Sequence, residues 1–367
     1  MNNFTPPESN ATNLTACTTA KKRITWLDSL KGFAIICVVI GHVVDGYIGG
    51  FTYPSALVAE FGIYQALYAF HMPLFFLISG FMFSLAYIDK DCRAKASKLK
   101  TQLLDIAAVY VIFSILLVAF KVLCARFANN AASFSDLLSI GWRPIAPYWY
   151  LYVLAFFYAS NIILVKFKKR AIMATALFIL SAFAALLPSF PTETIYQFIF
   201  FLPFFYLGTI LQRSGHTPHW SVAITGVVVA CALCLLFWSH STESYSGIVS
   251  RLPFVNTIVA LGLSIFFWKA FSAIKWLDNK AFALCGRYCL EIYVTHCFLT
   301  AGFRNVFIAL GVTNFWLCLL LNTALSTALP ILFAMGLERM GGHDILFRPA
   351  HWVKRLRERG AQASGGF

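Results

Sequence analysis

His42 lies in the middle of the first membrane-length apolar run of the chain, eleven residues after Lys31. An ionisable ring inside hydrocarbon costs free energy, so it needs a polar partner, a water-filled cavity or a chemical task. Imidazole changes its protonation near neutral pH and can act as an acid–base catalyst or as a nucleophile. The alternative is a buried histidine that bonds to a carbonyl group. We expect His42 to be the centre of the chemistry.

Two other histidines and one carboxylate are expected near His42. His71 lies near one end of the second apolar run, at a depth similar to that of His42, and His296 lies deep in the ninth run. Asp45 follows His42 by three residues on the same helical face, where it can orient the imidazole or bind hydroxyl groups. The alternatives are packing or capping beside Pro73 for His71 and an ordinary solvated carboxylate for Asp45. The predicted catalytic residues are His42, His71, His296 and Asp45.

Membrane-spanning helices must position these residues. The 367-residue chain is 59% hydrophobic and 12% charged, whereas charged residues approach about 25% of a soluble domain. Apolar runs of about 17 to 25 residues are long enough to cross a bilayer as helices. We predict an all-α integral membrane protein, a bundle of about ten transmembrane helices, at approximately residues 32–50, 66–88, 101–123, 148–165, 171–188, 195–212, 219–238, 252–272, 284–303 and 315–337.

Basic residues indicate how this bundle is oriented. With a cytoplasmic N-terminus, the segments on the cytoplasmic side hold 24 of the 29 lysines and arginines, and the outer segments hold five. An excess of basic residues is typical of cytoplasmic loops, because positive charge orients helices during insertion. We therefore expect both termini in the cytoplasm.

The segments outside the helices are short. Residues 1–22 are polar and predict a disordered cytoplasmic tail, residues 23–345 form the ten-helix membrane domain, and residues 346–367 form a basic cytoplasmic tail. No cleavable signal peptide is expected before the first helix. Because no soluble catalytic domain is expected, the chemistry must occur in the membrane domain or its loops.

Charge and cysteine content argue against two other classes of protein. The net charge of +14 is explained by basic loops that meet anionic lipid head groups, so nucleic acid is not an expected partner. Most of the ten cysteines fall inside apolar runs, where cysteine behaves as a small hydrophobic residue. Cys231 and Cys234 share a helix but lack histidine or carboxylate neighbours. We expect no metal site.

Several blocks of sequence are similar to one known family. The spacing of Lys31 and His42 matches its signature, a basic residue, ten residues and then a histidine. The chain resembles the acyltransferase-3 family of membrane O-acyltransferases, especially its fucose 4-O-acetylase-like branch, from about Arg23 to beyond His296. The blocks that carry the resemblance are Asp28 to His42, Phe70 to Phe81, Trp149 to Leu151, Phe201 to Gly208 and Ile292 to His296.

The resemblance implies an O-acetyltransferase of the bacterial inner membrane. Such an enzyme takes acetyl from cytosolic acetyl-CoA, with no bound cofactor, and delivers it to a hydroxyl of a cell-surface or lipid-linked glycan such as O-antigen or exopolysaccharide. Lys31, Arg93, Lys95 and Lys98 would hold the donor phosphates at the cytoplasmic end, and Trp149 would contact the acceptor sugar. The alternative for these basic residues is a role in orienting the helices alone, and for Trp149 membership of an interfacial aromatic belt. The partners implied are acetyl-CoA, a glycan acceptor and the lipid bilayer.

The chain departs from the family pattern at two places. The loop at residues 93–100 offers mainly lysines where the family often has an Arg-x-x-Arg pair, and lysine lacks the bidentate geometry of arginine. Glu291 stands where the family usually has an apolar or hydroxyl residue. Because Glu291 lies one turn after Arg287, we expect an ion pair between them.

Two other kinds of function fit parts of the pattern. A secondary transporter or channel would use intramembrane histidines to relay protons or bind cargo. Such a protein usually shows internal pseudo-symmetry and broken helices in corresponding halves, and the sequence shows neither by inspection. A non-catalytic assembly partner would give His42 no task.

Overall fold

The computed structural model describes residues 23–49, 57–125, 132–184, 193–238 and 253–364. Within these residues the protein is helical and contains no strand, only an isolated bridge between Ile88 and Ala94. The expected tail at residues 1–22 lies outside the described residues, as do the ends of several expected spans. The helices and 3-10 turns are α1 (Thr25–Gly49), α2 (Leu57–Tyr68), α3 (His71–Tyr87), α4 (Ala96–Leu123), η3 (Phe134–Ser139), α5 (Trp149–Leu164), α6 (Arg170–Ala184), α7 (Glu193–Ser214), α8 (Trp220–Trp238), α10 (Pro253–Ala273), η4 (Lys275–Leu277), α11 (Lys280–Arg287), α12 (Cys289–Ala309), α13 (Phe315–Arg339), α14 (His343–Phe347) and α15 (Pro349–Ser364).

Six helical stretches in the described residues are long and apolar enough to cross a bilayer, where a helix satisfies its own backbone polar groups. Three shorter apolar helices lie in α5, α6 and α8. Helix α12 is at the ninth expected span but is not among the six, and it buries the polar side chains of Glu291, His296 and Arg304. The chain is thus a helical membrane protein with six candidate spans, and the count of ten remains a prediction. The six are 25–48, 62–87, 96–123, 193–214, 254–273 and 315–339.

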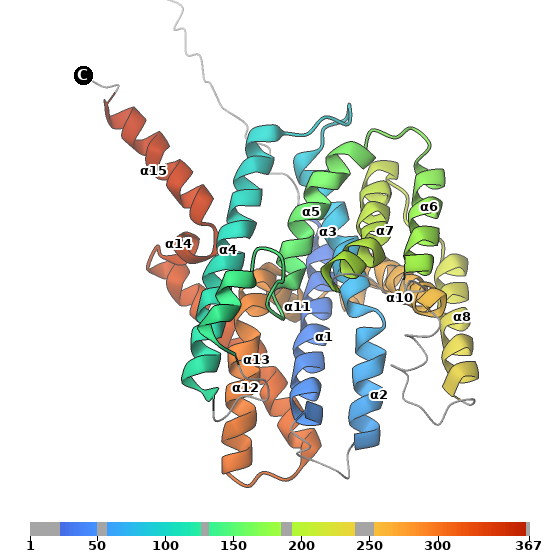
Figure 1. Cartoon of the computed structure of the whole chain (residues 1–367). Coiled ribbons are helices and arrows are strands. Elements are labelled where there is room, and N and C mark those ends of the chain that lie inside the picture. The colour runs from blue at the N-terminus through green and yellow to red at the C-terminus, as the bar shows by residue number, and fades with distance from the viewer. Residues whose placement is uncertain (1–22, 50–56, 126–131, 185–192, 239–252, 365–367) are drawn as a thin grey trace, which may run out of the picture.

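Helix α1 is the central element of the bundle. In Figure 1, α12 and α13 lie on one side of α1, and α6, α8 and α10 lie on the other. Helix α1 packs against α2, α3, α10, α11, α12 and α13. A residue on α1 can therefore meet side chains from most parts of the chain.

Glycines allow the closest helix contacts. A Cβ atom on Gly32 of α1 or on Gly286 of α11 would lie 1.8 Å from a backbone carbonyl oxygen of the other helix. Helices α3 and α7 cross in the same way at Gly80 and Gly208. Small residues permit such close backbone approach between helices in a membrane. The crossing at Gly32 fixes the position of the N-terminal part of α1, where Lys31 is the neighbouring residue.

The second expected span begins with a break between α2 and α3. Helix α2 ends at Tyr68 and α3 begins at His71. Pro73 lies in the first turn of α3, where proline costs no helical hydrogen bond. His71 therefore occupies the first position of a helix that starts inside the bundle, and its side chain is buried.

The C-terminal segment is folded onto the bundle. Residues 343–364 form α14 and α15, and α15 packs against α4 before it extends outward (Figure 1). Phe347 is 1% exposed and stacks on Phe113 of α4 with ring centroids 5.8 Å apart. The expected tail at residues 346–367 is therefore helical up to residue 364, and its beginning is part of the core.

Candidate functional site

The three predicted histidines come together from three helices. His42 of α1 and His296 of α12 have ring centroids 4.9 Å apart. Tyr68 lies beside both His42 and His71, with centroid distances of 6.5 Å and 4.7 Å. His71 and His296 are both close enough to His42 to interact with it electrostatically. We call His42, His71 and His296 the histidine cluster.

Backbone carbonyls orient two of these rings. Nδ1 of His71 donates to the Leu67 carbonyl at 2.6 Å, and Nδ1 of His296 donates to the carbonyls of Tyr293 at 2.6 Å and Ile292 at 3.2 Å. Because a carbonyl only accepts, both rings carry their proton on Nδ1 when neutral. The lone pair is then on Nε2, which is the arrangement of a base whose orientation is fixed by a third group.

Cys297 adds a thiol to this cluster. Its Sγ lies 3.3 Å from Nε2 of His296. One ligand atom from each of His42, His296 and Cys297 lies within 4.8 Å of the others, and these are donor types that bind Zn²⁺. Sequence inspection missed this set because His42 is more than 250 residues away along the chain. The expectation that the protein has no metal site therefore needs a direct test.

A cavity of about 570 Å³ opens from His42 towards the end of the bundle where α1 finishes. Asp45, Lys121 and Arg304 are its charged lining residues. Arg304 donates to the Gly46 carbonyl at 3.1 Å, which ties α12 to the end of α1. We call this space the far cavity. It brings the predicted Asp45 to the same cavity as His42.

A second cavity, of about 980 Å³, lies at the opposite end of α1. Six cationic and four acidic side chains line it, and we call it the basic cavity. Asp28 pairs with Arg23 and, at 3.9 Å, with Lys31. Asp344 pairs with Arg355. Burial alone would raise the pKa of Asp344, but its hydrogen bonds with Arg355 and His343 hold that pKa below its ordinary value. The cationic residues are Arg23, Lys31, Arg287, Arg348, Arg355 and Arg359.

The expected ion pair between Arg287 and Glu291 is wrong. Arg287 lies 3.7 Å from Glu338 of α13, and Glu291 lies 2.7 Å from Nε2 of His343. Both Glu291 and His343 are buried and line the basic cavity. The fold explains the difference, because the segment after α13 returns to α12 and offers Glu291 a buried partner.

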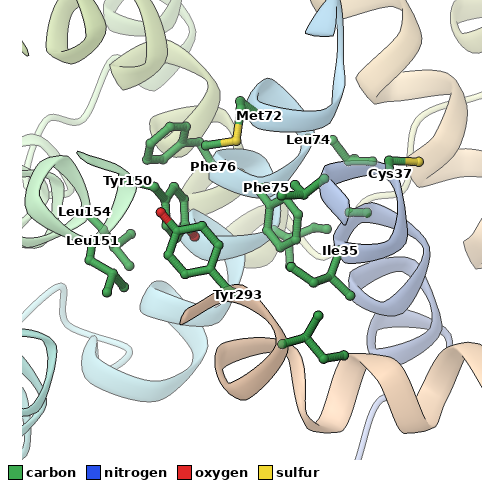
Figure 2. Packing of buried hydrophobic residues seen from close by; sticks show 14 of the residues in the cluster. Ile35, Cys37, Met72, Leu74, Phe75, Phe76, Tyr150, Leu151, Leu154 and Tyr293 are labelled. Carbon is green, nitrogen blue, oxygen red and sulfur yellow. The ribbon is translucent and has the colours of Figure 1, made fainter. Parts of the chain in front are cut away.

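A third cavity, of about 440 Å³, shares the lining residues Lys31 and Arg348 with the basic cavity and extends towards the neighbourhood of the histidines. Val38, Met72 and Tyr293 line it, and each is close in sequence to a histidine of the cluster. Figure 2 shows Tyr150 of α5 and Tyr293 of α12 beside Phe75 of α3, and the two tyrosine rings are 5.4 Å apart. We call this space the central cavity. His42 lines the far cavity, and residues within four positions of each cluster histidine line the central cavity.

One face of α1 lines all three cavities in turn. Lys31 lines the basic and central cavities, Val38 lines the central cavity, and His42 and Asp45 line the far cavity. These positions are spaced by seven, four and three residues, which keeps them on one face of a helix with 3.6 residues per turn. The motif spacing of eleven residues therefore aligns a lysine and a histidine along one continuous surface.

Four predicted site residues lie neither in the histidine cluster nor among the residues that line these cavities. Arg93, Lys95 and Lys98 are exposed in the loop between α3 and α4 and at the start of α4, and they are not among the residues that line the three cavities. Trp149 stacks on Phe201 of α7 with ring centroids 5.4 Å apart. Sequence reasoning also missed Arg348, which lines two cavities. The only available signal was the density of basic residues near the C-terminus.

Comparisons with known proteins agree with the resemblance found in the sequence. The acyltransferase domain of the acyltransferase-3 family matches residues 24–335. The chain is 29% identical over 237 residues to the nodulation protein NolL of Sinorhizobium fredii (63% of this chain, 62% of that protein) and 26% identical over 225 residues to NolL of Mesorhizobium japonicum (60% and 58%). It thus spans about three fifths of the length of these curated relatives, and no solved structure matches it. Because the match covers most of its length, the chain belongs to the acyltransferase-3 family.

Proposed function

We propose that the protein is an O-acetyltransferase of the bacterial inner membrane. It takes acetyl from cytosolic acetyl-CoA and delivers it to a hydroxyl group of a cell-surface or lipid-linked glycan. The observation that carries this proposal is the alignment of Lys31, Val38 and His42 on one face of α1, along which the basic, central and far cavities follow one another. Family membership supports acyl transfer as the reaction.

The donor enters from the basic cavity. Coenzyme A carries several phosphates on its nucleotide and a long, uncharged arm that ends in the thioester. The cationic lining of the basic cavity suits the phosphates, and the smaller central cavity suits the arm. Lys31 and His42 are about 16 Å apart along α1, which is of the order of the length of the arm. Arg93, Lys95 and Lys98 then attract the donor from the surface without contacting it.

The acceptor enters from the far cavity. A hydroxyl group that reaches His42 gives its proton to the imidazole while the hydroxyl oxygen attacks the thioester carbonyl carbon. The carbon–sulfur bond breaks, the new carbon–oxygen bond forms, and the proton passes to the departing thiolate. Asp45 binds acceptor hydroxyl groups beside His42, and His296 acts as a second oriented base. In this arrangement both termini and the basic cavity lie on the cytoplasmic side, and the far cavity lies on the other side. Acetyl therefore crosses the membrane through the protein.

The proposal is tested by two measurements on the full-length protein. Purified protein in detergent should hydrolyse acetyl-CoA slowly and be stabilised against heat by CoA. Deletion of its gene should remove acetyl groups from a cell-surface glycan. A transporter or channel would show neither result and would instead carry a solute in vesicles, and that outcome would replace the proposal.

Topology provides an independent test. Cysteines introduced at Ser97, near the start of α4, and at Leu310, after α12, should be labelled from opposite sides of the membrane. Membrane-impermeant maleimide added to intact spheroplasts should label position 310 and not position 97. The reverse pattern would place the basic cavity outside, where acetyl-CoA is absent, and would end the proposal of transfer across the membrane.

A further inference from the structure

Two side chains stand at the junction of the basic and central cavities. Among the described residues, Lys31 and Arg348 are the two that line both spaces. Lys31 belongs to α1, and Arg348 lies between α14 and α15. A ligand that extends from one cavity into the other must therefore pass between an ammonium group and a guanidinium group.

The acids of the basic cavity form their ion pairs with residues other than Arg348. Glu338 pairs with Arg287, Asp344 with Arg355, and Glu291 with His343. Asp28 is bonded to Arg23. Its carboxylate is 3.9 Å from the Lys31 ammonium group, a longer contact than a hydrogen bond. Within the residues that the structure describes, Arg348 makes no ion pair, and its side chain is exposed to the two cavities. Positive charge at the junction is thus available to an anion.

Arg348 is held in place from both sides. The preceding residue, Phe347, is buried against Phe113 of α4. After it, the buried carboxylate of Asp105 accepts hydrogen bonds from the backbone N–H of Ala350 at 2.7 Å and also bonds the His351 ring. Asp105 and His351 themselves line the central cavity. The guanidinium group therefore extends from an anchored backbone at the mouth of the central cavity.

We propose that Arg348, together with Lys31, binds the phosphate groups next to the arm of a phosphorylated-nucleotide thioester. This inference rests on the proposed function and adds the residue that recognises the donor. A guanidinium group binds phosphate through two parallel hydrogen bonds, whereas an ammonium group acts as a point charge. Arg348 lies beyond residues 24–335, the part that matches the acyltransferase domain. The C-terminal segment thus completes the donor site of this chain.

The test measures ligand-induced thermal stabilisation of full-length protein in neutral detergent. The ligands are CoA and pantetheine, which has the arm but no nucleotide. The variants are Arg348→Gln, Arg348→Lys and Lys31→Gln. Arg357→Gln is the matched control, because Arg357 is an exposed arginine on α15 that is not among the cavity-lining residues.

Arg348→Gln should weaken the apparent affinity for CoA by about 10- to 100-fold, the usual effect of losing hydrogen bonds to a charged group. Arg348→Lys should recover part of this loss, and Arg357→Gln should bind CoA as the wild type does. Any response to pantetheine should be the same in all variants. If Arg348→Gln is unstable, the partial loss expected for Arg348→Lys provides the same test.

The contrary outcomes separate the inference from the proposed function. Unchanged CoA affinity in Arg348→Gln would overturn the inference and leave the acetyltransferase proposal intact. A wild-type protein that CoA does not stabilise would overturn both. Stabilisation by phosphatidylglycerol in mixed micelles, lost in Arg348→Gln while CoA affinity is unchanged, would assign Arg348 to a lipid head group instead.

Discussion

The basic cavity and the far cavity lie at opposite ends of α1 and are lined by different kinds of side chain. Ten charged residues line the basic cavity, and most of them form ion pairs. Three charged residues line the far cavity, among aliphatic, aromatic and small side chains. A highly charged ligand suits only the first space, while a ligand rich in hydroxyl groups suits the second. The contrast is the basis on which we propose a different substrate for each end of the bundle.

In the proposed mechanism His42 acts on both substrates, so its loss should have the largest effect. We expect His42→Ala to lower acetyl transfer by about 100- to 10,000-fold, the usual contribution of a positioned acid–base group. Membrane insertion and expression should be unchanged. Glycan acetylation in cells that express the variant measures the effect, and wild-type levels would remove His42 from the mechanism.

Lys31 should affect only the basic end. Lys31→Gln removes a charge at the junction of two cavities, and we expect the KM for acetyl-CoA to rise about 10-fold or more, with the KM for the acceptor unchanged. Steady-state kinetics in membranes, with each substrate varied in turn, separates the two constants. An impaired acceptor KM with a normal donor KM would reverse the assignment of the two cavities.

Asp45 should show the opposite pattern at the far end. Asp45→Asn keeps the shape of the side chain and removes its charge, so we expect a rise of about 3- to 10-fold in the acceptor KM, the effect of weakening one hydrogen bond. The donor KM should stay constant. The same kinetic measurement serves here, and a selective effect on the donor would contradict the proposed division.

The loop cations should have a small effect that depends on salt. Replacing Arg93, Lys95 and Lys98 together by glutamine removes exposed charges that lie outside the cavities. We expect at most about a 3-fold rise in the donor KM at low ionic strength, and less at high salt, because exposed charges are screened. A large effect that persists at high salt would indicate direct contact with the donor.

Metal removal should have no effect. If His42, His296 and Cys297 act as acid–base and thiol groups, dialysis against EDTA should leave acetyl transfer unchanged. Loss of activity that Zn²⁺ restores would instead show that these three residues hold a metal between the two cavities.

The sequence predicted local features of the site well and distant ones poorly. The depth of His42 and His296 follows from their positions in apolar runs, so their approach could be anticipated from two helices of the right length. The break before α3 could also have been recognised, because Pro73 favours the first turn of a helix. Arg348 could not, since its place depends on Asp105, which is more than 240 residues earlier in the chain.

The partner of Glu291 shows the same limit. An ion pair within one helix is the simplest expectation from spacing, but burial of Glu291 favoured a partner that is buried with it. That partner, His343, follows the last expected span and precedes the expected basic tail at residues 346–367, and its sequence gives no sign of a contact with α12. Residues that anchor a chain end to a core are difficult to distinguish by composition from residues that remain in solvent.

The single lining face of α1 makes the spacing of residues along this helix as important as their identity. Each residue advances the helix by about 1.5 Å and turns it by about 100°. One residue inserted between Val38 and His42 would rotate the imidazole away from His296 while Lys31 stayed fixed at the glycine crossing with α11. The eleven-residue interval therefore cannot change without misaligning Lys31 and His42 along the lining face.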